Sequence, residues 1–264
     1  MKNWYRVLMM VAVLTGMVGA AEFLGEKEII FPEVAALCVG VFLAPKMAWK
    51  CSRSMMIVSI TVCAILGTCI SQFLPWPLWS KLILSYFIAQ LALIASRTTL
   101  APMISASVLP VMMGTTGYVY PLSAFVLAAV CAVLPGNKFD PSLATKNAWG
   151  TWRDYGLRSI IVSVWIGAAY CIGFVPLAAP PLLVAYTQLS RPDHPMRKRL
   201  MPALCMIAFC ALVGVFVRYA LVITLGLPIT LAAAVASTVV AMTMIRTSLF
   251  FPPAAAMAIL PLLF

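Results

Sequence analysis

Charged residues are scarce in this sequence: 9% of its 264 residues are Asp, Glu, Lys or Arg, whereas 64% are hydrophobic. Soluble domains carry about 25% charged residues, and a core of this size cannot hide so much apolar surface from water. The composition therefore excludes an ordinary soluble protein and predicts an all-α polytopic membrane protein. The apolar runs are continuous rather than alternating, which argues against an outer-membrane β-barrel.

Acidic residues and histidine are especially rare, with seven Asp and Glu residues in total and a single histidine, His194. No H-E-x-x-H, G-x-S-x-G or P-loop motif occurs, so the sequence predicts no enzyme. The eight cysteines form no C-x-x-C pair, and nearly all lie in apolar runs, where cysteine behaves as a small hydrophobic residue. We therefore expect neither a metal site nor an organic cofactor.

Basic residues outnumber acidic ones, which gives a net charge of +11. No basic face with interleaved aromatic residues exists outside the apolar segments, so we expect no nucleic acid as a partner. In membrane proteins, Lys and Arg gather in cytoplasmic loops, and the expected partner is the lipid bilayer. The N-terminal stretch "MKNWYRVLMMVAVLTGMVGAAE" resembles a signal peptide. A similar basic-flanked apolar segment opens the second half of the chain, so we expect the N-terminal stretch to be a membrane helix.

Apolar segments alternate with short polar loops, six before a polar stretch at 135–158 and five after it. Several are shorter than the ~20 residues that a full span needs, and the short ones contain prolines. A proline costs little at a helix start, because the first-turn N–H has no partner there anyway. We therefore expect about 10–11 membrane segments, including short, proline-broken helices. The segments lie at about 5–24, 29–44, 54–74, 79–96, 99–113, 116–135, 157–175, 178–190, 200–224, 228–245 and 249–264.

The two halves of the chain resemble each other in the order and spacing of matching segments, which predicts an internal duplication. The matches pair "RTTLAPMISASVLP" (97–110) with "RTSLFFPPAAAMAILP" (246–261), "LPWP" (74–77) with "LGLP" (225–228), and "IIFPEVAAL" (29–37) with "LAAPPLLVA" (177–185). We assign residues 1–135 to a first repeat, 136–156 to a cytoplasmic linker and 157–264 to a second repeat.

The positions of the basic residues predict the orientation of the chain. If 99–113 crosses the membrane and the N-terminus is cytoplasmic, 15 of the 18 basic residues lie inside. If 99–113 is instead a re-entrant loop, the linker and the stretch "RPDHPMRKR" move outside. The positive-inside rule favours the first arrangement in a multi-pass protein of the cytoplasmic (inner) membrane. Six crossings then separate equivalent segments, so we expect parallel tandem repeats.

Each repeat contains an arginine and two hydroxyl residues, followed by proline and small residues. The hydroxyl residues are candidate N-caps of the next helix, whose free N–H groups and positive dipole end suit an anion. We expect the two helix starts to face each other and bind one anion. The alternative is that the arginines are membrane anchors and the small residues pack helices. The candidate residues are Arg97, Thr98, Thr99, Pro102, Ser105, Arg246, Thr247, Ser248, Pro252, Pro253 and Ala254.

Four of the seven acidic residues, Glu22, Glu26, Glu28 and Glu33, cluster near the other predicted face of the membrane. Glu33 follows a proline inside an apolar segment, so it is the best candidate for a carboxylate that couples transport to a proton or cation. The alternative is ion pairing of Glu22 and Glu33 with two basic residues in apolar surroundings, Lys81 and Arg218.

These motifs together resemble the HPP family of integral membrane proteins, whose unit is a four-helix module with an Arg-Thr-x-His-Pro-Pro signature. The resemblance covers roughly 29–135 and 176–264, so the chain looks like two fused modules. It is carried by "FPEVAALCVGVFLAPKMAWKCSRSMMIV" (31–58), "RTTLAPMISASVLPVM" (97–112) and "RTSLFFPPAAAMAILPLL" (246–263). The signature histidine is replaced by Leu100 and Phe251. Plant chloroplast relatives are described as nitrite transporters, which fits an anion site.

The sequence thus predicts a small secondary transporter or channel for a small, nitrite-like anion. Two other functions stay open at this point. One is a non-transporting membrane subunit that packs against a partner, and the other is an exporter of aromatic acids. The oligomeric state is also open, and a homo-oligomer is one alternative.

Overall fold

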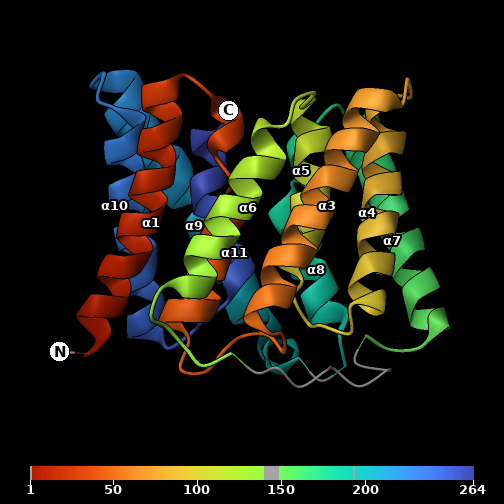
Figure 1. Ribbon diagram of the computed structural model, residues 1–264, viewed down its shortest axis with the longest axis horizontal. Helices are drawn as coiled ribbons and strands as arrows, with labels where there is room; N and C mark the ends of the chain where they lie inside the picture. The colour runs from red at the N-terminus through yellow and green to blue at the C-terminus, as the bar shows by residue number, and fades with distance from the viewer. Residues whose placement is uncertain (1, 140–148, 193) are drawn as a thin grey trace. The chain divides into compact units, whose positions relative to one another are not determined.

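The computed structural model describes residues 2–139, 149–192 and 194–264, and over these ranges the chain is helical without a strand (Figure 1). The all-α class predicted from composition is confirmed. The helices are α1 (Lys2–Leu24), α2 (Glu33–Cys38), α3 (Arg53–Phe73), α4 (Leu78–Ala95), α5 (Pro102–Met113), α6 (Val119–Val133), α7 (Trp152–Cys171), α8 (Pro180–Ser190), α9 (Leu200–Val217), α10 (Ile229–Thr247) and α11 (Pro252–Ile259).

Within the described ranges, five helical stretches are long and apolar enough to cross a membrane. They comprise α1, α3, α4, α10 and the continuous stretch Pro195–Thr224 that contains α9. The polytopic membrane character predicted from the sequence is therefore confirmed. The identity of the membrane and the side of the N-terminus stay predictions.

The chain divides into two compact units that are each assembled from separate segments. Unit 1 consists of Met1–Ala48, Leu127–Lys138 and Arg199–Phe264, and unit 2 of Trp49–Val126 and Phe139–Lys198. Helix α6 is therefore shared, and each unit takes helices from both predicted repeats. Two predicted cytoplasmic regions lie partly outside the described residues: the linker through 140–148 and the stretch "RPDHPMRKR" through Asp193.

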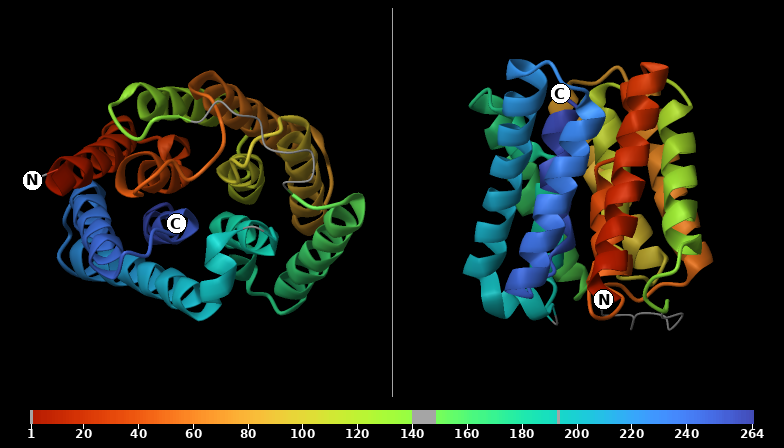
Figure 2. Two further views of the ribbon diagram at one scale, coloured as in Figure 1. Left: turned by 90° about the horizontal axis from the view of Figure 1, so that it is seen from below. Right: turned by 90° about the vertical axis from the view of Figure 1, so that its left-hand side faces the viewer.

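Unit 1 is a row of long helices with short helices on one face. Helix α10 packs against α1 and α9, and the short helices α2 and α11 pack against each other and against this row (Figure 2). Every residue of α2 is buried, and all but one residue of α11. A π-helical segment, Val39–Leu43, continues α2, and the Asn137 side chain donates to the Ala44 carbonyl at its end, at 2.7 Å.

Unit 2 has the same internal plan. Helix α4 packs against α3 and α7, and the short helices α5 and α8 pack against each other, with α5 also contacting α3 and α4 (Figure 1). By chain order, α9, α10 and α11 of unit 1 correspond to α3, α4 and α5 of unit 2. Helices α1 and α2 of unit 1 likewise correspond to α7 and α8. Each unit thus contains three helices from one predicted repeat and two from the other.

Equivalent glycines let the short helices approach the long ones closely. A Cβ atom on Gly67 of α3 would lie 2.0 Å from the Ser107 carbonyl oxygen of α5, and a Cβ on Gly214 of α9 would lie 2.3 Å from the Ala258 carbonyl oxygen. Both glycines lie at the same distance from the start of their helix. Such contacts are typical of helix packing in membranes, where small residues let backbones approach.

Proline begins the short helices, as the sequence predicts. Pro102 is the first residue of α5, Pro180 the first of α8 and Pro252 the first of α11. Proline lacks the N–H that would need a partner at this position, and its fixed φ suits the first turn. Short helices can therefore start inside apolar surroundings with fewer unsatisfied donors.

Candidate functional site

The first arginine motif is held in place by its two threonines. Arg97 adopts a left-handed backbone conformation with φ 48°, which is uncommon for a residue with a side chain. Thr98 and Thr99 are both buried. The Lys50 backbone N–H donates to Thr99 Oγ1 at 2.8 Å, and the Thr99 N–H donates to the Lys50 carbonyl at 3.3 Å. These bonds fix the motif to the segment that precedes α3.

The prediction that the hydroxyl residues are N-caps is wrong. The N-cap of α5 is Ala101 and that of α11 is Phe251, and neither provides a side-chain hydrogen bond. The hydroxyl residues lie in the chain before these helices begin. Thr247 is still in α10 and donates to the Thr243 carbonyl at 2.8 Å, and Ser248 ends α10 with φ 51°.

The other candidates lie in or near the first turns of the short helices, and the two motifs fall in different compact units. Five of these candidates are buried, Pro102, Ser105, Pro252, Pro253 and Ala254, whereas Arg97, Arg246, Thr247 and Ser248 are exposed. Leu100 and Phe251 are fully buried. The first motif belongs to unit 2 and the second to unit 1, so the binding of one anion by both motifs stays a prediction.

Trp149 connects the first motif to two further arginines of unit 2. Its indole Nε1–H donates to the Thr98 carbonyl at 2.8 Å. Its own carbonyl accepts from Arg158 Nη2 at 2.6 Å. The Arg158 and Arg191 guanidinium groups lie 5.8 and 5.6 Å from the centroid of the indole ring, within the range of cation–π attraction. Sequence reasoning missed Trp149 and Arg158. The sequence did contain a signal for Arg158, which is an arginine at the edge of an apolar segment.

Arg97 lines a cavity of about 450 Å³ in unit 2. Its other lining residues are Ile94, Trp149, Gly150, Thr151, Trp152 and Tyr155, so the lining residues that the structure describes include a cation and no carboxylate. The Asp154 carboxylate beside it accepts from the Thr151 N–H at 2.7 Å and from the Thr151 hydroxyl at 2.9 Å. These bonds hold the pKa of Asp154 below its usual value, the backbone bond having the larger effect. Because Asp154 already occupies the start of α7, an anion in this cavity would depend on Arg97.

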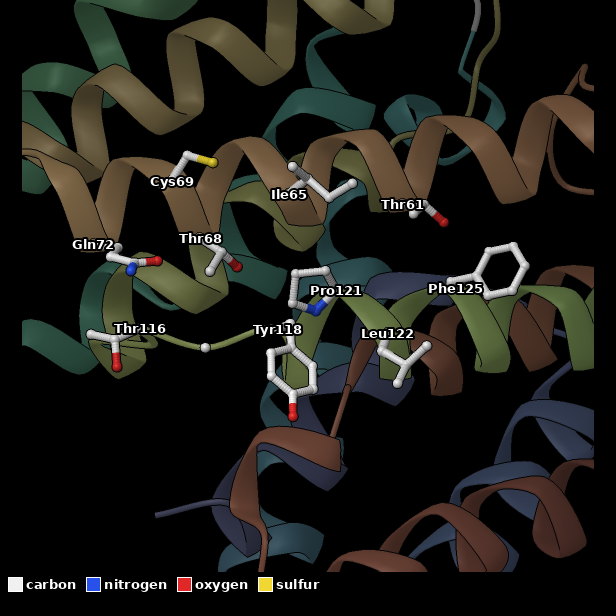
Figure 3. Close-up of a pocket in the computed structure, with 11 residues that line it drawn as sticks. Thr61, Ile65, Thr68, Cys69, Gln72, Thr116, Tyr118, Pro121, Leu122 and Phe125 are labelled. Carbon is white, nitrogen blue, oxygen red and sulfur yellow. The ribbon is translucent and has the colours of Figure 1, made fainter.

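A second cavity of unit 2 has a volume of about 630 Å³ and lies between α3 and the start of α6 (Figure 3). Thr61, Ile65 and Cys69 reach it from α3, and Pro121 and Phe125 from α6. The volume would accommodate an aromatic ring. However, no charged residue lines the cavity, so it offers nothing to balance the carboxylate of an aromatic acid.

Glu22 binds the start of another helix. Its carboxylate accepts from the Ile229 N–H at 3.1 Å, the Thr230 N–H at 3.0 Å and the Thr230 hydroxyl at 2.6 Å. The first N–H groups of α10 thereby gain a charged acceptor, as a capping residue would provide. These bonds join the end of α1 to the start of α10, and they indicate a structural role for Glu22.

The remaining members of the predicted acidic and basic cluster lie on several different elements. Glu33 is 1% exposed in the first turn of α2, and Arg218 begins the π-helical segment Arg218–Thr224 after α9. Lys81 belongs to unit 2, where its Nζ donates to the Ser71 carbonyl at 3.0 Å. The exposed residues Glu26 and Lys27 lie in the turn after α1. Pairing of Glu33 with Arg218, and a coupling role for Glu33, stay predictions.

No protein-family model matches the chain, and searches of curated proteins and of solved structures also give no match. The functional argument therefore depends on the geometry of this chain. Among the described residues, no group of three or more His, Cys, Asp and Glu side chains could hold a metal ion.

Proposed function

We propose that the protein is a small secondary transporter or channel of the cytoplasmic membrane and that it carries a small anion such as nitrite. The observation that carries this proposal is the cavity at Arg97, whose described lining combines a guanidinium group with indole and hydroxyl groups and includes no carboxylate. A guanidinium group binds a small oxyanion through two parallel N–H···O bonds. The nearby guanidinium groups of Arg158 and Arg191 add positive potential around Trp149.

The expected strength of binding suits a transporter. A hydrogen bond to a charged group contributes about 1.5–3 kcal/mol, so two or three such bonds correspond to millimolar to micromolar affinity. A site of this strength can also release its cargo. The resemblance to two fused HPP modules supports the same function, and the second motif at Arg246 would then serve as the equivalent element of the other repeat.

Binding and flux of nitrite in one purified sample test the proposal. The wild-type protein, reconstituted in liposomes, should take up nitrite, and calorimetry in detergent should give its affinity. We expect Arg97→Gln to weaken binding by about tenfold or more and Arg97→Lys to retain part of it. Lys46→Gln, which removes an exposed cation that is not among the lining residues of the cavity, controls for net charge and should bind nitrite as the wild type does.

Arg246→Gln measures the contribution of the second motif. We expect a smaller effect than that of Arg97→Gln, because Arg97 lines the cavity of unit 2, whereas Arg246 lies at the end of α10 in unit 1. Unchanged nitrite affinity in a folded Arg97→Gln sample would overturn the assignment of the cavity. Absence of uptake by the wild type, together with copurification of a stoichiometric partner, would instead support a non-transporting subunit.

A further inference from the structure

Helices α4 and α7 of unit 2 face each other with polar side chains. On α7, Tyr155, Ser159 and Ser163 recur every four residues and therefore share one face of the helix. On α4, Tyr86 and Gln90 have the same spacing. We name these five residues together the α4–α7 seam; the two helices lie side by side (Figure 1).

The seam is closed at its centre by hydrogen bonds. Gln90 Nε2 donates to Ser159 Oγ at 3.3 Å, and the Tyr155 hydroxyl donates to the Phe87 carbonyl at 3.4 Å. The rings of Phe87 and Tyr155 lie 5.5 Å apart between centroids. Gln90 is 2% exposed, so its amide reaches neither lipid nor bulk water in this conformation.

A cavity lies at each end of this closure. One is the Arg97 cavity, which Tyr155 lines. The other has a volume of about 270 Å³ and is lined by Tyr86, Ser159 and Ser163 together with Trp76, Trp79 and neighbouring residues of α4. Ser159 and Tyr155 are one helical turn apart on α7, so the two cavities are lined by successive turns of one helix face. Among the described residues, neither lining contains a carboxylate.

Helix α7 has an apolar face in addition to this polar one. Ile160 and Val164, next in sequence to the two serines, are large apolar residues with most of their surface exposed, as expected for side chains that contact lipid. Polar side chains within membrane helices turn toward protein or a water-filled cavity because lipid does not satisfy them. The serines of α7 follow that rule, with Ser163 on the cavity side.

We propose that the α4–α7 seam is a passage for a small anion across unit 2 and that Gln90, with Ser159, forms its narrowest point. This inference rests on the proposed function, because the Arg97 cavity is one end of the passage. Hydroxyl and amide groups along the seam can donate hydrogen bonds to an anion that moves past Arg97, and the described lining residues of the two cavities include no carboxylate. Opening requires that the Gln90 and Tyr155 side chains leave their partners.

Access of a hydrophilic thiol reagent tests whether the seam holds a passage. In a background without native cysteines, Ser159→Cys and Ser163→Cys should react with an anionic methanethiosulfonate reagent about tenfold faster than Val164→Cys, since thiolates form poorly in lipid. Val162→Cys, at a buried position on the same helix, is the second control. Equal rates at the two serine positions and at both controls would overturn the passage.

Nitrite flux tests the role of Gln90. Gln90→Leu keeps the approximate volume and removes the amide, so we expect flux to fall by about tenfold or more while nitrite affinity changes less than about twofold, because Arg97 is untouched. Flux that survives unchanged in a folded Gln90→Leu protein would overturn Gln90 as the narrow point. Rapid modification of Ser159→Cys without any nitrite binding would overturn the anion function and leave a passage for another solute. If Gln90→Leu does not fold, the cysteine variants still decide whether the passage exists.

Discussion

At the scale of single residues, the two arginine motifs differ in backbone although their sequences match. Helix α4 ends before Arg97, which takes the left-handed conformation, whereas α10 continues through Arg246 and Thr247 and ends at Ser248. A left-handed residue other than glycine costs of order 1–3 kcal/mol and persists where the surroundings determine it. Around Arg97 the bonds from Thr98 and Thr99 provide that constraint. Because of this difference in backbone, we expect Arg97→Gln and Arg246→Gln to weaken nitrite binding by different amounts.

The single histidine gives a prediction about pH. Burial, and secondarily the positive charge of Arg191, lower the pKa of His194 to about 4. Because the folded-state pKa lies below the usual value, the unfolded chain binds the proton more readily, and stability falls as pH decreases from about 6.5 to about 4. Ring resonances of this one histidine, followed by NMR, should titrate near 4, and Arg191→Gln should move the midpoint upward without reaching 6.5. A midpoint of 6.5 in the wild type would contradict the buried position of the ring.

The sequence identified part of the candidate site and missed the rest for a physical reason. Arg97 was recognisable because arginine is rare inside an apolar chain and its motif occurs twice. The contact between Thr98 and Trp149 joins residues 51 positions apart, and no local pattern marks it. The predicted N-cap role of the hydroxyl residues was also wrong, because a threonine near a helix boundary can serve the helix that ends as well as the one that begins.

At the scale of elements, the prolines predicted where short helices start. The sequence did not show which helices pack closely together. The apolar segments at 99–113 and 178–190 became α5 and α8, which begin at Pro102 and Pro180. A glycine that lets two helices approach closely cannot be distinguished, in the sequence, from a glycine that lies at no close helix contact. Gly67 and Gly16 both lie within long apolar helices, yet an added Cβ on Gly16 would meet no other residue within 4 Å.

Alanine substitution at these glycines is a direct test of the packing. Gly67→Ala and Gly214→Ala would press a methyl group against backbone carbonyls, which cannot move aside as a flexible side chain can. We expect each to destabilise its unit by about 1–3 kcal/mol, the usual cost of overpacking. Gly16→Ala is the matched control and should be neutral or slightly stabilising, because alanine favours helix more than glycine does. Thermal unfolding in detergent measures all three, and equal midpoints would mean that α3 and α9 do not pack as described.

At the scale of the whole molecule, the duplication predicted from sequence and the compact units are different divisions of the chain. Unit 1 joins α1 and α2 to α9, α10 and α11, and the bonds from Glu22 to the start of α10 bridge more than 200 residues. If two helices pack with the other repeat instead of with their own, each helix still contacts the same kind of neighbour. No local sequence has to change for this exchange. The order of elements could therefore be predicted, whereas their partners could not.

The orientation of the chain in the membrane is the last prediction, and α9 offers a simple test. The basic residues Arg197, Lys198 and Arg199 precede this helix, whereas Arg218 is the one basic residue between its end and the turn at Leu225. The positive-inside rule places the basic end in the cytoplasm, so residues before and after one crossing should differ in access. In a cysteine-free background, an impermeant maleimide applied to intact cells should label Leu225→Cys and should label Lys198→Cys only after the membrane is permeabilised. The reverse pattern would place the basic end of α9 outside the cell and would contradict the orientation predicted from the positions of the basic residues.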